Sequence, residues 1–209
     1  MFVISFYSPS HLNYGRRMEQ MLSANDIPHR VYTSDWLDRQ EYYEQNKWLV
    51  DEIRGFRLWS WKPVIMLDAL RYHDKVLYLD ASVVIDDFDM AERYIEENKI
   101  VTAPPTAWKN YEWTAGSCFQ VMKCEEEKYH NGTHVWAGCV AVSNSPETKQ
   151  FLREWLYYCS IPAALKGDDA VENLPGFVQH RWDQSILSLM LIEYGYEPKP
   201  LPVAHDSDM

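Results

Sequence analysis

Residues 76–82 read Val-Leu-Tyr-Leu-Asp-Ala-Ser. Four large residues in succession are typical of a central β-strand that is covered on both faces. The aspartate, Asp80, follows directly, and ligands of open α/β sheets bind beyond the carboxyl ends of the strands. Aspartate is also a common turn residue. The position alone therefore leaves two readings of Asp80 open, a ligand-binding group and a strand terminator.

Strands and helices are expected to alternate around this central strand. The sequence predicts strands at 2–7, 29–33, 82–85, 99–102 and 135–142, and helices near 12–22, 36–50, 61–70, 146–155 and 182–192. Ser145-Pro146 is a typical helix start, with a capping serine and a proline in the first turn. Residues 162–176 and the tail from Pro198 are predicted to be irregular, and 108–130 stays unassigned. The alternation favours a single α/β domain over 1–209, with a mostly parallel central sheet flanked by helices. The chain is complete or a fragment of a longer protein.

The composition is that of an ordinary globular protein, with 46% hydrophobic and 24% charged residues. The formal net charge of −11 disfavours duplex nucleic acid and anionic membrane surfaces as partners. An acidic protein that binds a phosphorylated ligand needs a metal ion or a local basic clamp, and Arg16, Arg57 and Lys62 are candidates for the clamp. No apolar run approaches the ~18 residues of a membrane-spanning helix.

Four cysteines without a CxxC pair argue against a disulfide scaffold and a zinc site. We therefore expect reduced thiols and a cytoplasmic protein. The sequence also contains no P-loop, GxGxxG, GxSxG or HExxH motif, which disfavours several nucleotide-binding and hydrolytic families.

Nine tryptophans and fourteen tyrosines are a high aromatic content. Aromatic faces pack against sugar rings and bases, although core packing is expected to account for more than half of these residues. Trp108, Trp113 and Trp136 lie in or beside the least regular region, so they are the first candidates for a sugar-binding wall.

Two further sets of residues are candidates for chemistry. An aspartate and a histidine, Asp80 and His205, together suit Mn²⁺ or a similar divalent ion, although a single histidine in a polar tail is more often a surface residue. Asp183 and Gln184 begin the predicted helix near 182–192. The helix dipole is a sufficient structural reason for an acid such as Asp183 in a first turn.

Four segments, taken in order, resemble GT-A-fold nucleotide-sugar glycosyltransferases, and the fourth resembles the retaining, glycogenin-like type. They are the opening strand with its Ser-Pro-Ser loop (2–10), the stretch 57–63 leading into 77–82, the segment Trp-Ala-Gly-Cys-Val-Ala-Val-Ser-Asn (136–144), and His-Arg-Trp-Asp-Gln-Ser-Ile-Leu (180–187).

The resemblance implies a role for each segment, and it places residues 136–144 along the reaction centre. In such enzymes an Asp-x-Asp motif binds Mn²⁺ and the donor diphosphate. Here it reads Asp80-Ala81-Ser82, so the second acid is missing. The resemblance assigns Mn²⁺ or Mg²⁺ to Asp80 and His205, and the ribose, a phosphate or a metal-bound water to Ser82. It places the uracil and ribose near Tyr7, Ser8 and Arg57, and it places Asp183 and Gln184 beside the transferred sugar.

We therefore expect metal-dependent transfer of a hexose or deoxyhexose from a UDP-sugar to a glycan hydroxyl, with retention. The partners are a nucleotide sugar and a glycan acceptor, and the protein is a monomer or part of a larger chain. Three alternatives stay open. One is a non-catalytic carbohydrate-binding module, and another is a degenerate transferase that serves as a scaffold. The third, a phosphohydrolase, is disfavoured because its nucleophilic aspartate usually follows the first strand.

Overall fold

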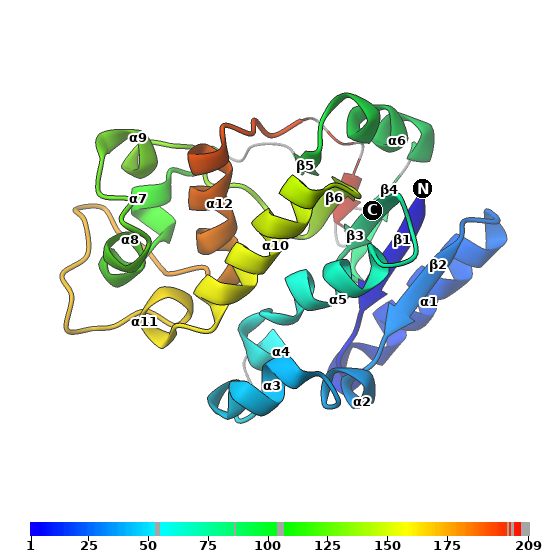
Figure 1. Ribbon diagram of the computed structural model, residues 1–209, viewed down its shortest axis with the longest axis horizontal. Coiled ribbons are helices and arrows are strands. Elements are labelled where there is room, and N and C mark those ends of the chain that lie inside the picture. The colour runs from blue at the N-terminus through cyan, green and yellow to red at the C-terminus, as the bar shows by residue number, and fades with distance from the viewer. Residues whose placement is uncertain (53–54, 86, 104–106, 200, 202, 206–209) are drawn as a thin grey trace.

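A five-stranded sheet of order β2-β1-β3-β6-β5 forms the centre of the computed structural model (Figure 1). Its strands are β1 (Phe2–Phe6), β2 (His29–Tyr32), β3 (Lys75–Leu79), β5 (Ile100–Thr102) and β6 (Cys139–Ser143). β1 is parallel to β2 and β3, whereas β6 is antiparallel to both β3 and β5. Every strand of this sheet except β6 therefore runs in the same direction, which confirms the predicted α/β domain with a mostly parallel sheet.

The structure describes residues 1–52, 55–85, 87–103, 107–199, 201 and 203–205. A second sheet pairs β4 (Val83–Ile85) with β7 (Val203–His205) in antiparallel fashion, with Val83 opposite His205. β7 lies in the tail that the sequence predicted to be irregular, so that prediction was wrong. Its partner strand is distant in the sequence, and no local pattern marks the pairing.

Helices cover both faces of the large sheet (Figure 1). On β3, Val76 and Tyr78 belong to the same apolar cluster as α5 (Trp61–Ala69), α10 (Pro146–Cys159) and α12 (Asp183–Tyr194). Leu77 and Leu79 belong to the cluster of α1 (Leu12–Ala24) and α6 (Phe88–Glu97) on the other face. The unbroken apolar run of β3 is thus explained by burial on both sides. No helix in the described part of the chain is long and apolar enough to cross a bilayer.

The capping signals act as the sequence predicts. Ser145 Oγ accepts a hydrogen bond of 3.1 Å from the Thr148 backbone N–H at the start of α10. This bond satisfies one of the amide groups that a helix leaves unpaired at its first turn. Phe151, Leu152 and Trp155 of the same helix are fully buried.

Three predicted elements differ from the structure. The expected helix over 36–50 is divided into α2 (Ser34–Leu37), α3 (Glu41–Gln45) and η2 (Lys47–Leu49), and the expected loop at 162–176 contains α11 (Pro162–Leu165). The strand expected from residue 135 begins only at Cys139, because the backbone N–H groups of Val135 and Ala137 donate to side chains of α12 instead of a strand partner. The remaining short helices are η1 (Pro9–His11), α4 (Gly55–Leu58), α7 (Asn110–Trp113), α8 (Gly116–Met122) and α9 (Glu127–His130).

Candidate active site

A pocket of about 540 Å³ opens beyond the carboxyl ends of β1 and β3. Its walls come from three parts of the chain: the end of β1 and the start of α1, the region before α5, and the residues after β3. The resemblance implies donor contacts in all three parts, and the residues concerned line this one pocket: Tyr7, Ser8, Arg57, Asp80 and Ser82.

The first wall follows β1. Ser8 Oγ and Ser10 Oγ lie 2.8 Å apart, and both lie near His11 Nδ1, at 3.1 and 3.0 Å. Tyr7 packs closely on α1, because a Cβ at Gly15 would lie 1.8 Å from Cδ1 of the tyrosine ring. Glycine is therefore required at position 15 for Tyr7 to keep its place in the wall.

The second wall contains an unusual left-handed turn. Phe56, Arg57, Leu58 and Trp59 all have positive φ angles, of 45°, 61°, 53° and 58°. This conformation costs an L-residue roughly 1–2 kcal/mol, and such strain persists where surrounding contacts fix the chain, often at ligand sites.

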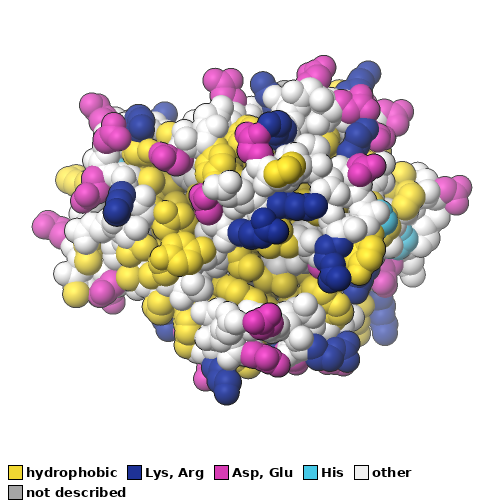
Figure 2. Space-filling view, in the orientation of Figure 1, with side chains coloured by type: hydrophobic (Ala, Val, Ile, Leu, Met, Phe, Trp, Pro, Cys, Tyr) yellow, Lys and Arg dark blue, Asp and Glu magenta, His cyan; other side chains and the backbone are white. Residues whose placement is uncertain are grey.

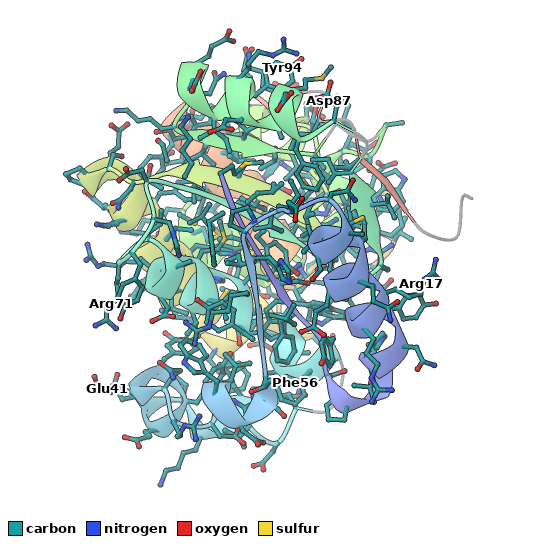
Figure 3. The ribbon with its side chains drawn as sticks, turned by 90° about the vertical axis from the view of Figure 1, so that its right-hand side faces the viewer. Arg17, Glu41, Phe56, Arg71, Asp87 and Tyr94 are labelled. Carbon is teal, nitrogen blue, oxygen red and sulfur yellow. The ribbon has the colours of Figure 1, made fainter. Side chains whose placement is uncertain are left out.

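Side-chain contacts hold the turn in place. The Phe56 ring lies 5.2 Å from that of Phe6, and Figure 3 shows Phe56 between α1 and the α2–α3 segment. The Arg57 guanidinium forms an ion pair with Asp38 and lies 4.3 Å from the centre of the Tyr43 ring. Only 4% of Arg57 is exposed, and its Nε and Nη1 atoms are buried without a hydrogen-bond partner. The turn thus presents a largely buried cation at the pocket.

Asp80 supplies the carboxylate of the third wall. Its backbone N–H donates to the Gly138 carbonyl at 2.8 Å, which fixes it beside β6. Its Oδ1 atom accepts a hydrogen bond from the Tyr78 hydroxyl and lies 3.9 Å from Lys62 Nζ. Burial and the Asp80 carboxylate raise the pKa of Tyr78 well above its ordinary value, so the phenol stays protonated and keeps donating.

Lys62 joins Asp80 to a second, buried carboxylate. Lys62 Nζ lies 3.0 Å from Asp183 Oδ2, and the two side chains are 4% and 3% exposed. Burial raises the pKa of Asp183 to about 7, although Lys62 opposes this shift. Burial disfavours the charged form of Lys62, but the attraction of Asp183 and Asp80 outweighs it, so its pKa is raised. The result is a row of alternating charges that runs from the pocket into the core.

The start of α12 fixes Asp183 and Gln184. Trp155 Nε1 donates to the Asp183 carbonyl at 3.1 Å, and Gln184 Oε1 accepts from the Ala137 N–H at 3.2 Å. Gln184 thereby ties α12 to the segment 136–144, the third of the four segments that carry the resemblance. Neither Asp183 nor Gln184 lines the pocket.

His180 holds the chain that leads into α12. Its Nδ1 atom accepts from the Ala115 N–H at 3.1 Å, and its Nε2 atom donates toward the carbonyls of Ala164 and Leu165. Burial lowers the pKa of His180 to about 4, so the ring is neutral near pH 7. This buried histidine connects α8 and α11 to the residues before Asp183.

The predicted tryptophan wall lies elsewhere. Trp108 and Trp113 stack on each other with ring centroids 4.2 Å apart, and Trp136 packs against Gly138. None of the three lines the pocket, whereas Trp59 and Trp61 do. Both belong to the 57–63 segment of the resemblance. No local pattern distinguished them from core residues, so they were not predicted as part of a binding wall.

The basic residues named as clamps have different positions. Arg57 lines the pocket, Lys62 is buried in its pair with Asp183, and Arg16 is exposed on α1 without lining the pocket. In Figure 2, Lys and Arg form small groups separated by acidic and apolar side chains.

A divalent ion is implied by the resemblance and can be tested against the residues present. Asp80 faces the pocket, and the register of β4 and β7 brings the backbone of His205 to the same edge, opposite Val83. The His205 side chain lies outside the described part of the structure. The described residues contain no group of three or more His, Cys, Asp or Glu that could hold a metal. The described residues thus supply one carboxylate of the expected metal site, that of Asp80.

The chain is similar in structure to mouse xyloside xylosyltransferase 1, with a TM-score of 0.51 and 9% identity over 95% of this chain and 84% of that one. The chain has the GT-A fold. The galactosyltransferase LgtC matches 98% of this GT-A chain and 86% of its own, with a TM-score of 0.48 and 14% identity. A glycosyltransferase involved in glycosylation of the major capsid of PBCV-1 matches 86% and 81%, with a TM-score of 0.39 and 10% identity. No family model and no curated protein sequence matches the chain.

Proposed function

We propose that the chain transfers a sugar from a UDP-sugar to a hydroxyl group of a glycan. The observation that carries this proposal is the pocket beyond β1 and β3, where five residues assigned to the donor by the resemblance lie on common walls. Ligands of open α/β sheets bind at this edge, and the GT-A fold is compatible with such a donor.

Residues on different walls of the pocket are proposed to bind the two ends of a nucleotide diphosphate. Tyr7, Ser8 and Arg57 offer aromatic, hydroxyl and guanidinium groups for the base and ribose. Asp80 and Ser82 lie on the third wall and are proposed to meet the diphosphate. The Ser82 hydroxyl occupies the position of the second acid of an Asp-x-Asp motif, where it is proposed to bind ribose, a phosphate or a metal-bound water.

Asp80 and His205 are proposed to hold Mn²⁺ or Mg²⁺ together with the donor. When bound, such an ion stabilises the negative charge of the leaving diphosphate as a Lewis acid. The Tyr78 hydroxyl and the Lys62 ammonium orient the Asp80 carboxylate, since both lie at its Oδ1 atom.

Asp183 and Gln184 are proposed to act at the transferred sugar, with retention of its configuration. An ionised Asp183 stabilises positive charge at the anomeric carbon, and Lys62 holds this carboxylate in position. Asp183 is buried and does not line the pocket. This role therefore requires that donor binding open the wall between Asp183 and the pocket. Gln184 holds the neighbouring segment through Ala137.

The test is nucleotide release from UDP-, GDP- and ADP-sugars, with Mn²⁺ or with EDTA. We expect UDP release with Mn²⁺ and its loss in Asp80→Ala, with Tyr72→Leu as a control at an exposed aromatic residue. A product with the configuration of the donor supports retention. Full turnover with unchanged stereochemistry in Asp183→Asn contradicts the role of Asp183. Glycan binding without nucleotide dependence favours the carbohydrate-binding alternative, and folded protein that binds no nucleotide favours a scaffold.

The setting of the enzyme is a further part of the proposal. All four cysteines are free and buried, which agrees with the expected reducing cytoplasm. The size and opening residues of the chain resemble the N-terminal transferase domain of a chlorella-virus protein, so we propose a viral protein that acts in the host cytoplasm. Fractionation of cells that produce the tagged protein tests this location.

A further inference from the structure

Trp59 and Trp182 connect the open pocket to the buried Asp183. Trp59 lines the pocket together with Arg57 and Asp80, and Trp182 directly precedes Asp183 in the chain. The two indole rings lie 5.0 Å apart at an angle of 35°. The contact between the two rings thus links a residue of the pocket lining to the residue that precedes Asp183.

The backbone beside both tryptophans is held by neighbours that are buried or hydrogen-bonded. Trp59 and Trp182 have positive φ angles of 58° and 50°, which side-chain-bearing residues rarely adopt. The preceding Leu58 is 2% exposed. On the other side, the Arg181 N–H donates to Ser185 Oγ at 3.0 Å. A surface that is already ordered loses little conformational freedom when a ligand settles on it.

The chemistry of this surface suits one class of ligand. Aromatic faces pack well on the C–H face of a pyranose, and both rings are partly exposed. Asp80, Glu52 and Arg57 line the same pocket. Glu52 is paired with Lys166 and Arg57 with Asp38, so Asp80 is the carboxylate that disfavours a sugar with its own negative charge. Lys62 lies behind Asp80 and is already paired with Asp183, so it does not offer a free cation to such a sugar.

We propose that Trp59, supported by Trp182, is the platform for the donor's sugar ring and selects a neutral hexose or deoxyhexose over a uronic acid. This inference rests on the proposed function. It replaces Trp108, Trp113 and Trp136 as the sugar-binding wall. Trp182 is a positioning residue, since it acts through the Trp59 ring.

The experiment compares the affinities of UDP and of UDP-sugars for the wild type, Trp59→Leu, Trp59→Phe and Tyr72→Leu. The probes are UDP-glucose, UDP-galactose, UDP-xylose and UDP-glucuronate, measured by calorimetry with Mn²⁺. We expect a neutral UDP-sugar to bind the wild type more tightly than UDP-glucuronate. Trp59→Leu lowers that affinity about tenfold and leaves UDP within about twofold, because loss of one aromatic contact corresponds to about 1.4 kcal/mol. Trp59→Phe retains most of the affinity, and Tyr72→Leu retains all of it.

A second measurement separates the platform from the proposed function. Saturation-transfer NMR with methyl glucoside and methyl galactoside needs no nucleotide site, and the platform predicts a signal that Trp59→Leu abolishes. If no nucleotide binds but this signal depends on Trp59, the proposed function fails, and Trp59 is a platform for a sugar that is not part of a nucleotide donor. If UDP-sugars bind equally well to wild type and Trp59→Leu, or if Trp108→Leu removes the sugar's contribution instead, the platform is wrong. If neither probe depends on Trp59, both are wrong.

Discussion

The pocket and the ion pair beside it are built in opposite ways. Asp80, on the pocket wall, has a side chain that is 24% exposed, whereas Lys62 and Asp183 are 4% and 3% exposed. A partly exposed carboxylate keeps its hydration until a ligand replaces it. A buried ammonium and a buried carboxylate depend on each other, because removal of either leaves an uncompensated charge in the core. Substitution of Asp80 should therefore change the free energy of unfolding little, whereas substitution of Lys62 or Asp183 should change it strongly.

The largest effect is expected at Lys62. Lys62→Ala leaves Asp183 without its ion-pair partner and should lower the free energy of unfolding by about 3–5 kcal/mol. Urea denaturation followed by circular dichroism measures this change. The double variant Lys62→Met/Asp183→Leu removes both charges and should regain a large part of the stability. A loss below ~1 kcal/mol in Lys62→Ala would contradict the dependence of the two buried charges on each other.

The pH dependence of stability should report the buried Asp183. Burial raises its pKa in the folded protein to about 7, above the value of about 3.9 in an unfolded chain. The folded state therefore holds the proton more tightly, and its stability falls as the pH rises from about 4 to about 7. Asp183→Asn has no carboxyl group that titrates at this position. The free energy of unfolding of the variant should therefore increase relative to that of wild type between pH 5 and pH 7.5. A constant difference between the two proteins over that range contradicts the raised pKa.

A smaller effect is expected at the pocket wall, in Arg57→Lys. The planar guanidinium contacts Asp38 and lies over the Tyr43 ring, and a lysine ammonium cannot reproduce both contacts. We expect a loss of about 1–2 kcal/mol in stability and weaker UDP binding, measured by thermal unfolding and calorimetry. Unchanged UDP affinity in a folded Arg57→Lys protein would remove Arg57 from the donor site.

The smallest effect is expected at an exposed ion pair that serves as the matched control for Lys62 and Asp183. Lys99 and Glu147 form an ion pair with side chains that are about half exposed. Lys99→Ala should cost only ~0.2–1 kcal/mol in the same urea experiment. If Lys99→Ala costs as much as Lys62→Ala, burial does not explain the difference between the two pairs.

The sequence predicted the framework of this protein well, because the framework follows from local patterns. The apolar run of β3 and the Ser145-Pro146 helix start each consist of neighbouring residues, so both can be recognised from the sequence alone. β7 was missed because its only described strand partner, β4, is far away in the sequence. The first half of the predicted strand at 135–142 does not form, because its backbone donates to side chains of α12. A pattern of strand-forming residues carries no information on such distant partners.

The positions of five pocket residues could be predicted from the sequence, whereas the side-chain contacts around the pocket could not. Five residues predicted to contact the donor come from separate segments of the chain: Tyr7, Ser8, Arg57, Asp80 and Ser82. Only the resemblance to a known family predicted that they share one site. The position of Trp59 depends on a left-handed turn that its own residues disfavour, so propensity could not indicate it. Lys62 was expected as a phosphate clamp. Its pairing with Asp183 depends on the packing of α5 near α12, which the sequence does not show.

Calorimetric titration with UDP, GDP and ADP, each with and without Mn²⁺, tests the donor site most directly. We expect micromolar binding of UDP that needs Mn²⁺ and disappears in Asp80→Ala, with GDP and ADP bound more weakly. Absence of binding by all three nucleotides to folded protein would show that the pocket is not a nucleotide-donor site.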